Sequence, residues 1–239
     1  MKNVLIFLAR KIKANFIRFK LHNIFEPFDF IFLNIFYLSK FSKWKAGIKL
    51  LGFDDFYNKK VNYMDRYKLY EYISQKENLN KSIVYIEFGV CSGESFKWWV
   101  KNNINIESKF YGFDTFTGLP ENYGVYKSGD MSSSIPKLDD DRCEFIAGYF
   151  QKTLPRFINE ENLDNRLVIH CDADLYSSTM FVLSSIAPYL KKDDIIFFDE
   201  FSVPTHEFKA FYDFVSGFQL KYELIGAINN YLQIAIKIC

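Results

Sequence analysis

The chain has 239 residues, of which 49% are hydrophobic and 25% are charged, a globular composition that excludes an intrinsically disordered protein. Its length allows one α/β domain with a full core and an additional N-terminal segment. The formal net charge of +1 hides an asymmetry, because residues 1–50 carry ten Lys and Arg against Glu26 and Asp29, a net of +8, whereas the remainder carries −7. An acidic body suits metal ions and cationic cofactors.

The N-terminal region is predicted to be a basic and aromatic helical extension. Residues 2–23 have the pattern of a basic amphipathic helix, and residues 24–39 are strongly apolar but too few to cross a bilayer as a helix. Two interpretations remain open. The extension packs on the domain or on a partner subunit, or it lies on a membrane surface with Lys and Arg facing anionic lipid. The one-sided charge and the rich apolar face favour the membrane surface.

A glycine-rich turn organises the rest of the chain. Residues 83–88 are an apolar strand that carries Glu87 near its end, and a helix-prone segment begins at Ser95. Gly89 and Gly93 allow a positive φ and a close approach of a ligand to the backbone, and the helix presents free N–H groups. The Glu87 carboxylate would repel a pyrophosphate but suits a cationic or hydroxyl-bearing ligand. The spacing also differs from the G-x-G-x-x-G of dinucleotide sites.

A second apolar run, residues 110–114, ends in Asp114 and continues as G-F-D-T-F-T-G-L-P over residues 112–120. In doubly wound folds, an acid that ends the second strand hydrogen-bonds a ribose. Together with the glycine turn, this segment resembles the S-adenosylmethionine-dependent sugar O-methyltransferases of the macrocin O-methyltransferase type. That family carries a G-V-x-x-G-x-S turn and a D-S/T-F-x-G-L-P motif. Residues 148–155 also resemble its G-W-F-x-D-T-L-P, with Tyr149 for Trp and Lys152 for Asp.

The remaining pattern alternates strands and helices. Residues 121–141 lack periodicity, which predicts a lid or binding loop. Besides the two strands above, strands are predicted at 142–147, 166–171 and 194–198, helices at 63–75, 177–190 and 205–217, and a closing hairpin at 221–227 and 231–238. This order fits an α/β, Rossmann-like class I methyltransferase. We expect a seven-stranded, mostly parallel sheet whose terminal strand is antiparallel, with residues 1–60 as the helical extension and residues 61–239 as the domain.

Acidic residues follow two of these strands. Asp172 ends one strand, and the pair Asp199 and Glu200 ends the next, so the three carboxylates should meet at one sheet edge. They would repel one another unless a cation neutralised them, and an all-oxygen set suits Mg²⁺. The resemblance implies the same three ligands, because family members hold Mg²⁺ with an acid after the fourth strand and an acidic pair after the fifth. The family usually has Asp at the position of Glu200.

The cofactor contacts implied by the resemblance lie along the same edge and comprise Glu87, Gly89, Gly93, Ser95, Asp114, Gly148 and Tyr149. The glycine turn would hold the methionine and ribose portions, Asp114 the ribose hydroxyls, and Tyr149 the adenine by stacking. Methyl transfer to a sugar hydroxyl would then proceed by S_N2 displacement, with the metal lowering the pKa of the hydroxyl. Asp172 is one candidate for the general base and His206 is another.

We therefore expect an S-adenosylmethionine-dependent and Mg²⁺-dependent O-methyltransferase that acts on the sugar of a glycan or of a nucleotide-linked precursor. Residues 172–174 are also a D-x-D motif, typical of metal-dependent nucleotide-sugar glycosyltransferases. A non-catalytic membrane-surface adaptor with a relict fold is a third hypothesis. The four cysteines show no paired spacing, which favours reduced thiols and a cytoplasmic location, at the inner membrane face if residues 1–50 bind lipid. We expect no nucleic-acid partner, and homo-oligomerisation remains open.

Overall fold

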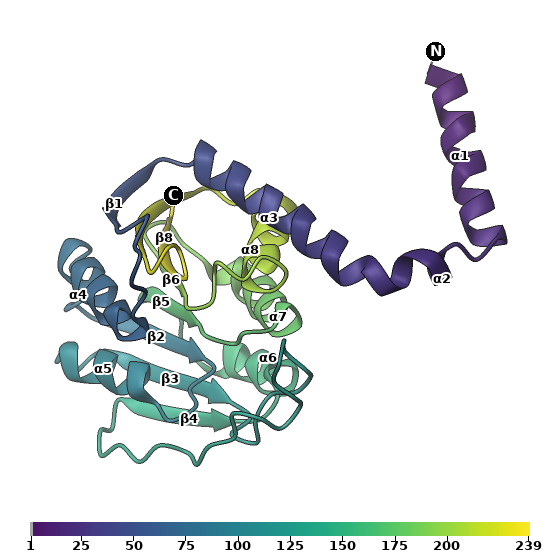
Figure 1. Ribbon diagram of the computed structural model, residues 1–239. Coiled ribbons are helices and arrows are strands. Elements are labelled where there is room, and N and C mark those ends of the chain that lie inside the picture. Colours follow the sequence, from purple (N-terminus) through teal and green to yellow (C-terminus); the bar gives the residue numbers. More distant parts are fainter. Residues whose placement is uncertain (1) are drawn as a thin grey trace.

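An eight-stranded sheet forms the centre of the structure, a computed structural model that describes residues 2–239 (Figure 1). The strand order across the sheet is β1-β7-β8-β6-β5-β2-β3-β4. Strand β8 is antiparallel to both of its neighbours, and the other pairs are parallel. The strands are β1 (Leu50–Asp54), β2 (Ile83–Phe88), β3 (Lys109–Asp114), β4 (Cys143–Ala147), β5 (Arg166–Cys171), β6 (Ile195–Phe198), β7 (Tyr222–Ile228) and β8 (Gln233–Ile238). The predicted class I methyltransferase sheet, with its antiparallel terminal strand, is confirmed.

The predicted number of seven strands is corrected to eight by strand β1. This strand pairs in parallel with β7, so that Leu50 faces Leu224 and Phe53 faces Gly226. No strand is predicted here from the sequence, because the segment is short, carries Gly52 at its centre and shows no regular alternation of apolar and polar residues. Strand β1 lies within the predicted extension 1–60 yet belongs to the sheet, and the boundary at residue 60 stays a prediction.

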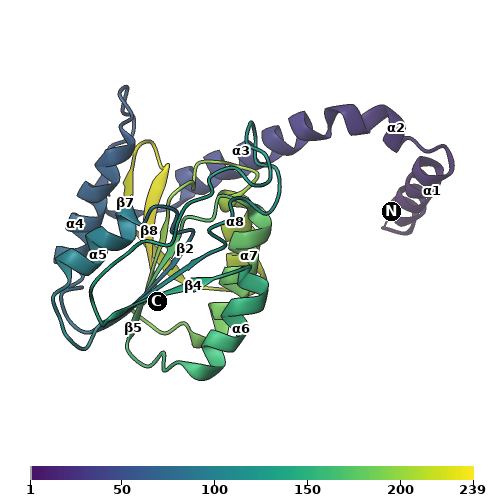
Figure 2. The same ribbon diagram turned by 90° about the horizontal axis from the view of Figure 1, so that it is seen from below.

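Helices cover both faces of the sheet. Helices α4 and α5 lie on one face, and α6, α7 and α8 lie on the other (Figure 2). Their bounds are α4 (Arg66–Lys76), α5 (Glu94–Asn102), α6 (Phe150–Glu160), α7 (Tyr176–Ile186) and α8 (Glu207–Gly217), with single 3₁₀ turns η2 (Tyr63–Asp65) and η3 (Ala187–Tyr189). Because both faces are covered, β2 and β6 are buried along their whole length, which explains their continuous apolar character.

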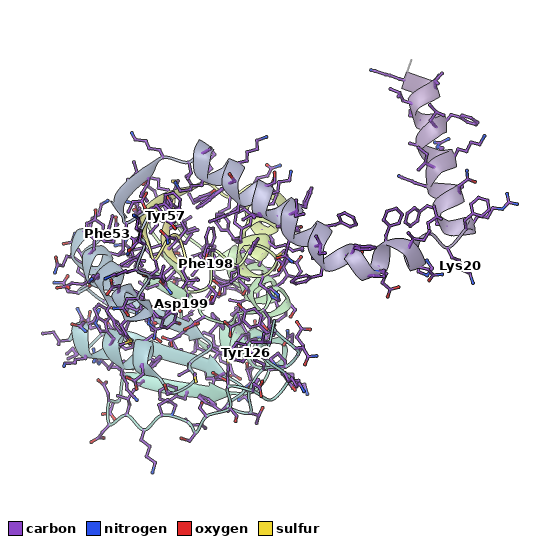
Figure 3. All side chains as sticks on the ribbon, in the orientation of Figure 1. Lys20, Phe53, Tyr57, Tyr126, Phe198 and Asp199 are labelled. Carbon is purple, nitrogen blue, oxygen red and sulfur yellow. The ribbon has the colours of Figure 1, made fainter. Side chains whose placement is uncertain are left out.

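The N-terminal helices extend away from this domain (Figure 1). They are α1 (Lys2–Arg18), α2 (His22–Phe25), the 3₁₀ turn η1 (Glu26–Phe28) and α3 (Asp29–Gly47). Lys20 lies at the bend between α1 and α2, far from Asp199 in the domain (Figure 3). Only the C-terminal half of α3 reaches the core, where Tyr37, Phe41 and Trp44 pack against it. No helix within residues 2–239 combines the length and the apolar character needed to span a bilayer.

Trp44 anchors α3 to the domain, and we expect its replacement to destabilise the fold. Its ring contacts Phe201 and Phe211, and its indole N–H donates a 2.8 Å hydrogen bond to the Tyr222 hydroxyl. In Trp44→Ala, the free energy of unfolding should fall by about 2–3 kcal/mol, since a partly buried ring and its hydrogen bond are lost. Phe30→Ala, on the exposed half of the same helix, should change it by less than about 0.5 kcal/mol. If urea titrations showed the same loss of unfolding free energy for Trp44→Ala and Phe30→Ala, the packing of Trp44 against the domain would be contradicted.

Glu77, at the C-terminus of α4, provides a pH-dependent contribution to stability. Its carboxylate accepts a 2.9 Å bond from Arg166 and a 3.2 Å bond from Lys237. Burial raises the pKa of Glu77, but these bonds outweigh burial and hold the pKa below its usual value. A lowered folded-state pKa gives stability that is present above the unfolded-state pKa and is lost as pH falls through the folded-state value.

Glu77→Gln should therefore cost about 1 kcal/mol near neutral pH, after allowance for solvent screening. The difference from the original chain should shrink as the pH is lowered through the acidic range, because Glu77 is then protonated in both states. Urea unfolding of both proteins at a series of pH values measures this difference in the free energy of unfolding. Glu71→Gln, on the exposed side of α4, is the matched control and should show no such trend. A pH-independent difference for Glu77→Gln would exclude this ion pair as its source.

Candidate active site

The glycine turn after β2 lies against the end of β5. Gly89 has φ +94°, and a Cβ added there would lie 1.8 Å from the Asp172 carbonyl oxygen. A side chain at position 89 would therefore push the two strand ends apart. Gly93 has φ +77° and is the N-cap residue of α5. These two glycines let the β2 turn approach Asp172 and open toward the space above the sheet edge.

Asp114 holds the second strand end in place. One of its carboxylate oxygens accepts a 2.8 Å bond from the Cys91 N–H in the glycine turn, and the other accepts a 2.8 Å bond from the Phe116 N–H. Gly148 N–H donates to the Asp114 carbonyl at 2.9 Å. The three segments that follow β2, β3 and β4 therefore meet at Asp114. A carboxylate has lone pairs beyond these two bonds, so it can also accept from ligand hydroxyl groups.

Beneath the turn lies a buried charge network that links three strands. The Tyr85 hydroxyl donates to Glu87 and lies 3.0 Å from His170 Nδ1. The Tyr70 hydroxyl donates to Asp199 at 3.3 Å and lies 3.2 Å from His170 Nε2. Both tyrosine hydroxyls can therefore accept from a doubly protonated His170. Burial lowers the pKa of His170, but Asp199 and Glu87 outweigh burial and raise it to about 9. His170 is thus a buried cation between two carboxylates.

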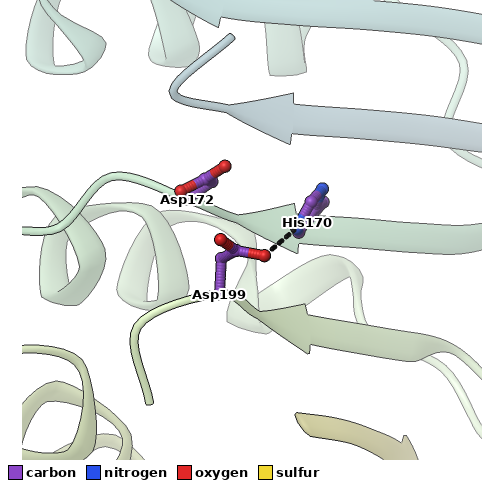
Figure 4. A group of neighbouring side chains, drawn as sticks. All are labelled: His170, Asp172 and Asp199. Atoms are coloured by element: carbon purple, nitrogen blue, oxygen red, sulfur yellow. Dashed lines mark ion pairs between the residues drawn. The ribbon is translucent and has the colours of Figure 1, made fainter. Parts of the chain in front are cut away.

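Asp199 is already paired within the protein (Figure 4). One of its oxygens accepts from the Tyr63 hydroxyl and from Arg66 Nη1, the latter at 3.2 Å. Arg66 Nη1 also lies 3.7 Å from Asp172 Oδ2. Burial raises the pKa of Asp199, but the bond from His170 and the charge of Arg66 hold it below its usual value. Asp199 is therefore ionised and carries most of its possible hydrogen bonds.

Above this network is a cleft of about 580 Å³, a volume suited to a cofactor-sized ligand. The loop of residues 115–142 closes over it. At one end Glu121 accepts a 2.6 Å bond from Ser177, and at the other Ser133 donates a 2.8 Å bond to the Cys91 carbonyl. Met131 of this loop lines the cleft. The loop predicted as a lid therefore bridges the start of α7 and the glycine turn.

Six acidic residues line the cleft, namely Glu94, Asp114, Glu121, Asp172, Asp174 and Glu200. Arg66 is the sole Lys or Arg in that lining within the described chain. Burial and then repulsion from Asp199 raise the pKa of Asp174 to about 6 and that of Glu200 to about 7. The same two causes raise the pKa of Asp172 well above its usual value. A bound cation would relieve this repulsion, so the cleft favours positively charged ligands.

The structure brings many of the predicted site residues to this cleft. Those that line it are Gly89, Ser95, Asp114, Tyr149, Asp172 and Glu200. Glu87 lies underneath, fully buried, and accepts a 2.7 Å bond from Ser95 Oγ. Gly93, Gly148 and Asp199 are not among the described residues that line the cleft. The roles proposed for all of these residues stay predictions.

His206 does not line the cleft in the described chain. It precedes α8, and its Nδ1 accepts a 3.3 Å bond from the Tyr176 N–H. Its ring contacts Tyr123 of the lid loop at 4.8 Å between centroids. Burial lowers the pKa of His206. The position gives this residue a structural task between α7 and the lid, and its predicted catalytic role stays a prediction.

Two cleft residues, Tyr63 and Arg66, were not recognised from the sequence as site residues. The apolar residues of the helix 63–75 recur at helical spacing, which predicts a core-facing stripe, and Leu69, Tyr70 and Ile73 are indeed buried. Arg66 lies near the start of this helix and is only 7% exposed. Lys68, two residues later, has the same charge but is solvent-exposed, so the sequence carries no local signal that Arg66 is buried beside a carboxylate.

The carboxylates fit a hard cation in part. His170, Asp172 and Asp199 place ligand atoms within 4.8 Å of one another, and Glu200 faces the same cleft. The oxygens of Asp172 and Glu200, with raised pKa values, are donors that a divalent ion would favour. His170 is a poor ligand, since both of its nitrogens are engaged with tyrosines. The protein oxygens thus suit Mg²⁺, with Arg66 as a competing internal cation.

Comparisons with known proteins agree with this geometry. Residues 86–201 match a family model described as a methyltransferase domain. A search of curated proteins finds no match. The structure is similar to CalS11, a calicheamicin methyltransferase, with a TM-score of 0.57 and 23% identity over 73% of this chain and 77% of that chain. It is also similar to the O-methyltransferase NovP, with a TM-score of 0.54 and 19% identity over 72% and 79% of the two chains.

The family match spans the glycine turn, Asp114, Asp172 and the Asp199–Glu200 pair, which are the parts that build the cleft. The structural similarity at these identities establishes the fold. Neither comparison favours the glycosyltransferase or the non-catalytic adaptor. Residues 86–201 therefore match a methyltransferase domain, and the chain has the fold of class I methyltransferases.

Proposed function

We propose that this protein is a methyltransferase that transfers the methyl group of S-adenosylmethionine to a sugar hydroxyl. The observation that carries the proposal is the acidic cleft beside the glycine turn, where carboxylates with raised pKa values can accept protons from hydroxyl groups. The motifs at residues 89–95 and 112–120 resemble those of sugar O-methyltransferases. CalS11, to which the fold is similar, is described as a TDP-rhamnose 3'-O-methyltransferase.

The cofactor would bind along the turn after β2. Its cationic sulfonium would face the acidic lining, and Asp114 would accept from its ribose hydroxyls. Tyr149, which is 48% exposed at the cleft, would stack on the adenine. In this arrangement the methyl group would face the side of the cleft that Asp172 and Glu200 line.

Asp172 is the proposed general base. Its side chain lines the cleft, where it can reach a hydroxyl group of a bound acceptor. Asp172, Asp199 and Glu200 would hold Mg²⁺, which when bound would lower the pKa of a coordinated sugar hydroxyl. Arg66 orients Asp199 and lies near Asp172, so it keeps these two carboxylates in position.

The substrate class can be tested directly. The protein is incubated with S-adenosylmethionine that carries an isotopically labelled methyl group, together with nucleotide-linked sugars and sugar glycosides. The products are then analysed by mass spectrometry. We expect the label in an O-methyl sugar. Label found only on nitrogen or carbon of other acceptors would overturn the assignment to a sugar hydroxyl.

S-adenosylhomocysteine should bind and stabilise the protein. At a concentration 100-fold above Kd, the stabilisation should be about 2.7 kcal/mol, detectable as a rise in Tm. Asp114→Asn should weaken binding at least about tenfold, because an ionised hydrogen-bond acceptor for the ribose is lost. Asp164→Asn makes the same change on an exposed loop before β5 and should bind normally. If all three proteins show no Tm shift at millimolar ligand, the proposed cofactor site is wrong.

Methyl transfer should require a divalent ion through the strand-end acids. Asp172→Asn keeps the side-chain size but removes a charge and the proposed base, so the rate should fall by about 10²-fold or more. Binding of S-adenosylhomocysteine should survive, because the glycine turn and Asp114 are unchanged. The assay compares EDTA-treated with Mg²⁺-supplemented protein, and Asp164→Asn again serves as the control. Full activity in EDTA would refute the metal, and full activity of Asp172→Asn would refute the base.

A further inference from the structure

The N-terminal arm, defined as residues 2–39, presents a large apolar surface that the rest of the chain leaves uncovered. Helices α1, α2 and α3 contain no buried residue. More than half of the large hydrophobic side chains that are exposed in the described chain lie within residues 4–38. Such a contiguous surface is unusual on a protein that has no partner for it.

Helix α1 has one continuous apolar face. Leu5, Leu8 and Ile12 follow one another on it at helical spacing and are 63%, 48% and 67% exposed. Arg10 projects from the opposite side of the helix, where Ile6 also lies, as the same spacing requires. An exposed helix that combines such an apolar face with basic residues is suited to lie in the plane of a lipid interface.

The first half of α3 is apolar on all sides. Phe30 is 75% exposed, Ile31 51% and Phe32 55%, and these consecutive residues point in different directions around the helix. A helix that is hydrophobic all round is normally buried in a protein core or in lipid. The domain does not bury this part of α3, because the contacts of α3 with the hydrophobic core begin at Tyr37.

The charge of the arm distinguishes between two possible partners for its apolar surface, a second copy of the chain and a lipid membrane. Residues 2–39 carry six Lys and Arg against Glu26 and Asp29, a net charge of +4. A second copy of the arm would bring the same positive charge against it, which opposes association. An anionic lipid surface offers negative headgroups for the basic residues and an apolar layer for the aromatic ones. We propose that the arm docks this methyltransferase on an anionic membrane surface.

The base of the arm adjoins the rim of the cleft. Lys209 Nζ lies 5.5 Å from the ring centre of Tyr37 and 3.2 Å from that of Tyr176. Tyr176 begins α7, and the next residue, Ser177, lines the cleft. The arm therefore leaves the domain beside its active-site opening, and docking places that opening near the lipid.

The test uses the full chain and lipid vesicles in a co-sedimentation assay. We expect binding to phosphatidylcholine vesicles that contain about one third phosphatidylglycerol, weak binding to phosphatidylcholine alone, and a decline with rising salt. Ile12→Glu introduces a charge into the apolar face of α1 and should lower the apparent affinity at least about tenfold. Asn3→Glu introduces the same side chain on the other side of α1 and should lose far less.

Three results would overturn the proposal. The first is that the full chain does not bind the anionic vesicles. The second is that Asn3→Glu loses as much binding as Ile12→Glu. The third is that the full chain forms a stable dimer, does not bind vesicles, and dissociates into monomers in the Ile12→Glu variant. The last result would assign the surface to a second copy. The Tm shift with S-adenosylhomocysteine should be unchanged in both variants, since residues 3 and 12 lie outside the domain. Loss of that shift in every variant would count against the cofactor site alone.

Discussion

The structure depends on a set of buried charges that joins the sheet to α4. Glu87 of β2 pairs in register with His170 of β5, and His170 in turn lies beside Asp199 after β6 and below Arg66 of α4. Buried charges are tolerated only when partners satisfy them. A slip of one residue in the register of β5 would turn His170 to the opposite face and leave both carboxylates unpaired. Sheet register and site geometry are therefore specified by the same contacts.

Local patterns in the sequence were sufficient to predict the domain and the strand-end acids. The glycine turn, Asp114 and Asp172 could be placed at one edge because strand ends and turn glycines are encoded by short segments. Arg66 could not be assigned in this way, because its partner Asp199 is 133 residues away along the chain. Glu87 was expected in the cleft, but its side chain turns beneath it toward Tyr85 and Ser95. The direction of a side chain at a strand end depends on neighbours that the sequence alone does not position.

The cleft combines two kinds of carboxylate with different tasks. Asp199 and Glu87 are ionised or hydrogen-bonded within the protein and form a fixed base under the site. Asp172, Asp174 and Glu200 face the ligand space and have raised pKa values, so their charge depends on what binds there. Arg66 contacts members of both groups, Asp199 and Asp172. Arg66 therefore joins the fixed base of the site to the carboxylates that face the ligand space.

Helix α3 continues from the arm into the core without a flexible linker, from Asp29 to Gly47. A flexible tether would let the domain sample many orientations, and the effective concentration of an acceptor would then follow from linker length. A continuous helix anchored by Trp44 restricts that sampling, so the height and tilt of the cleft are fixed relative to whatever holds the arm. Acceptors within that reach meet the cleft in a favourable orientation, whereas others are out of range. The continuous helix α3 thus restricts which acceptors can reach the cleft, according to their distance from the surface that holds the arm.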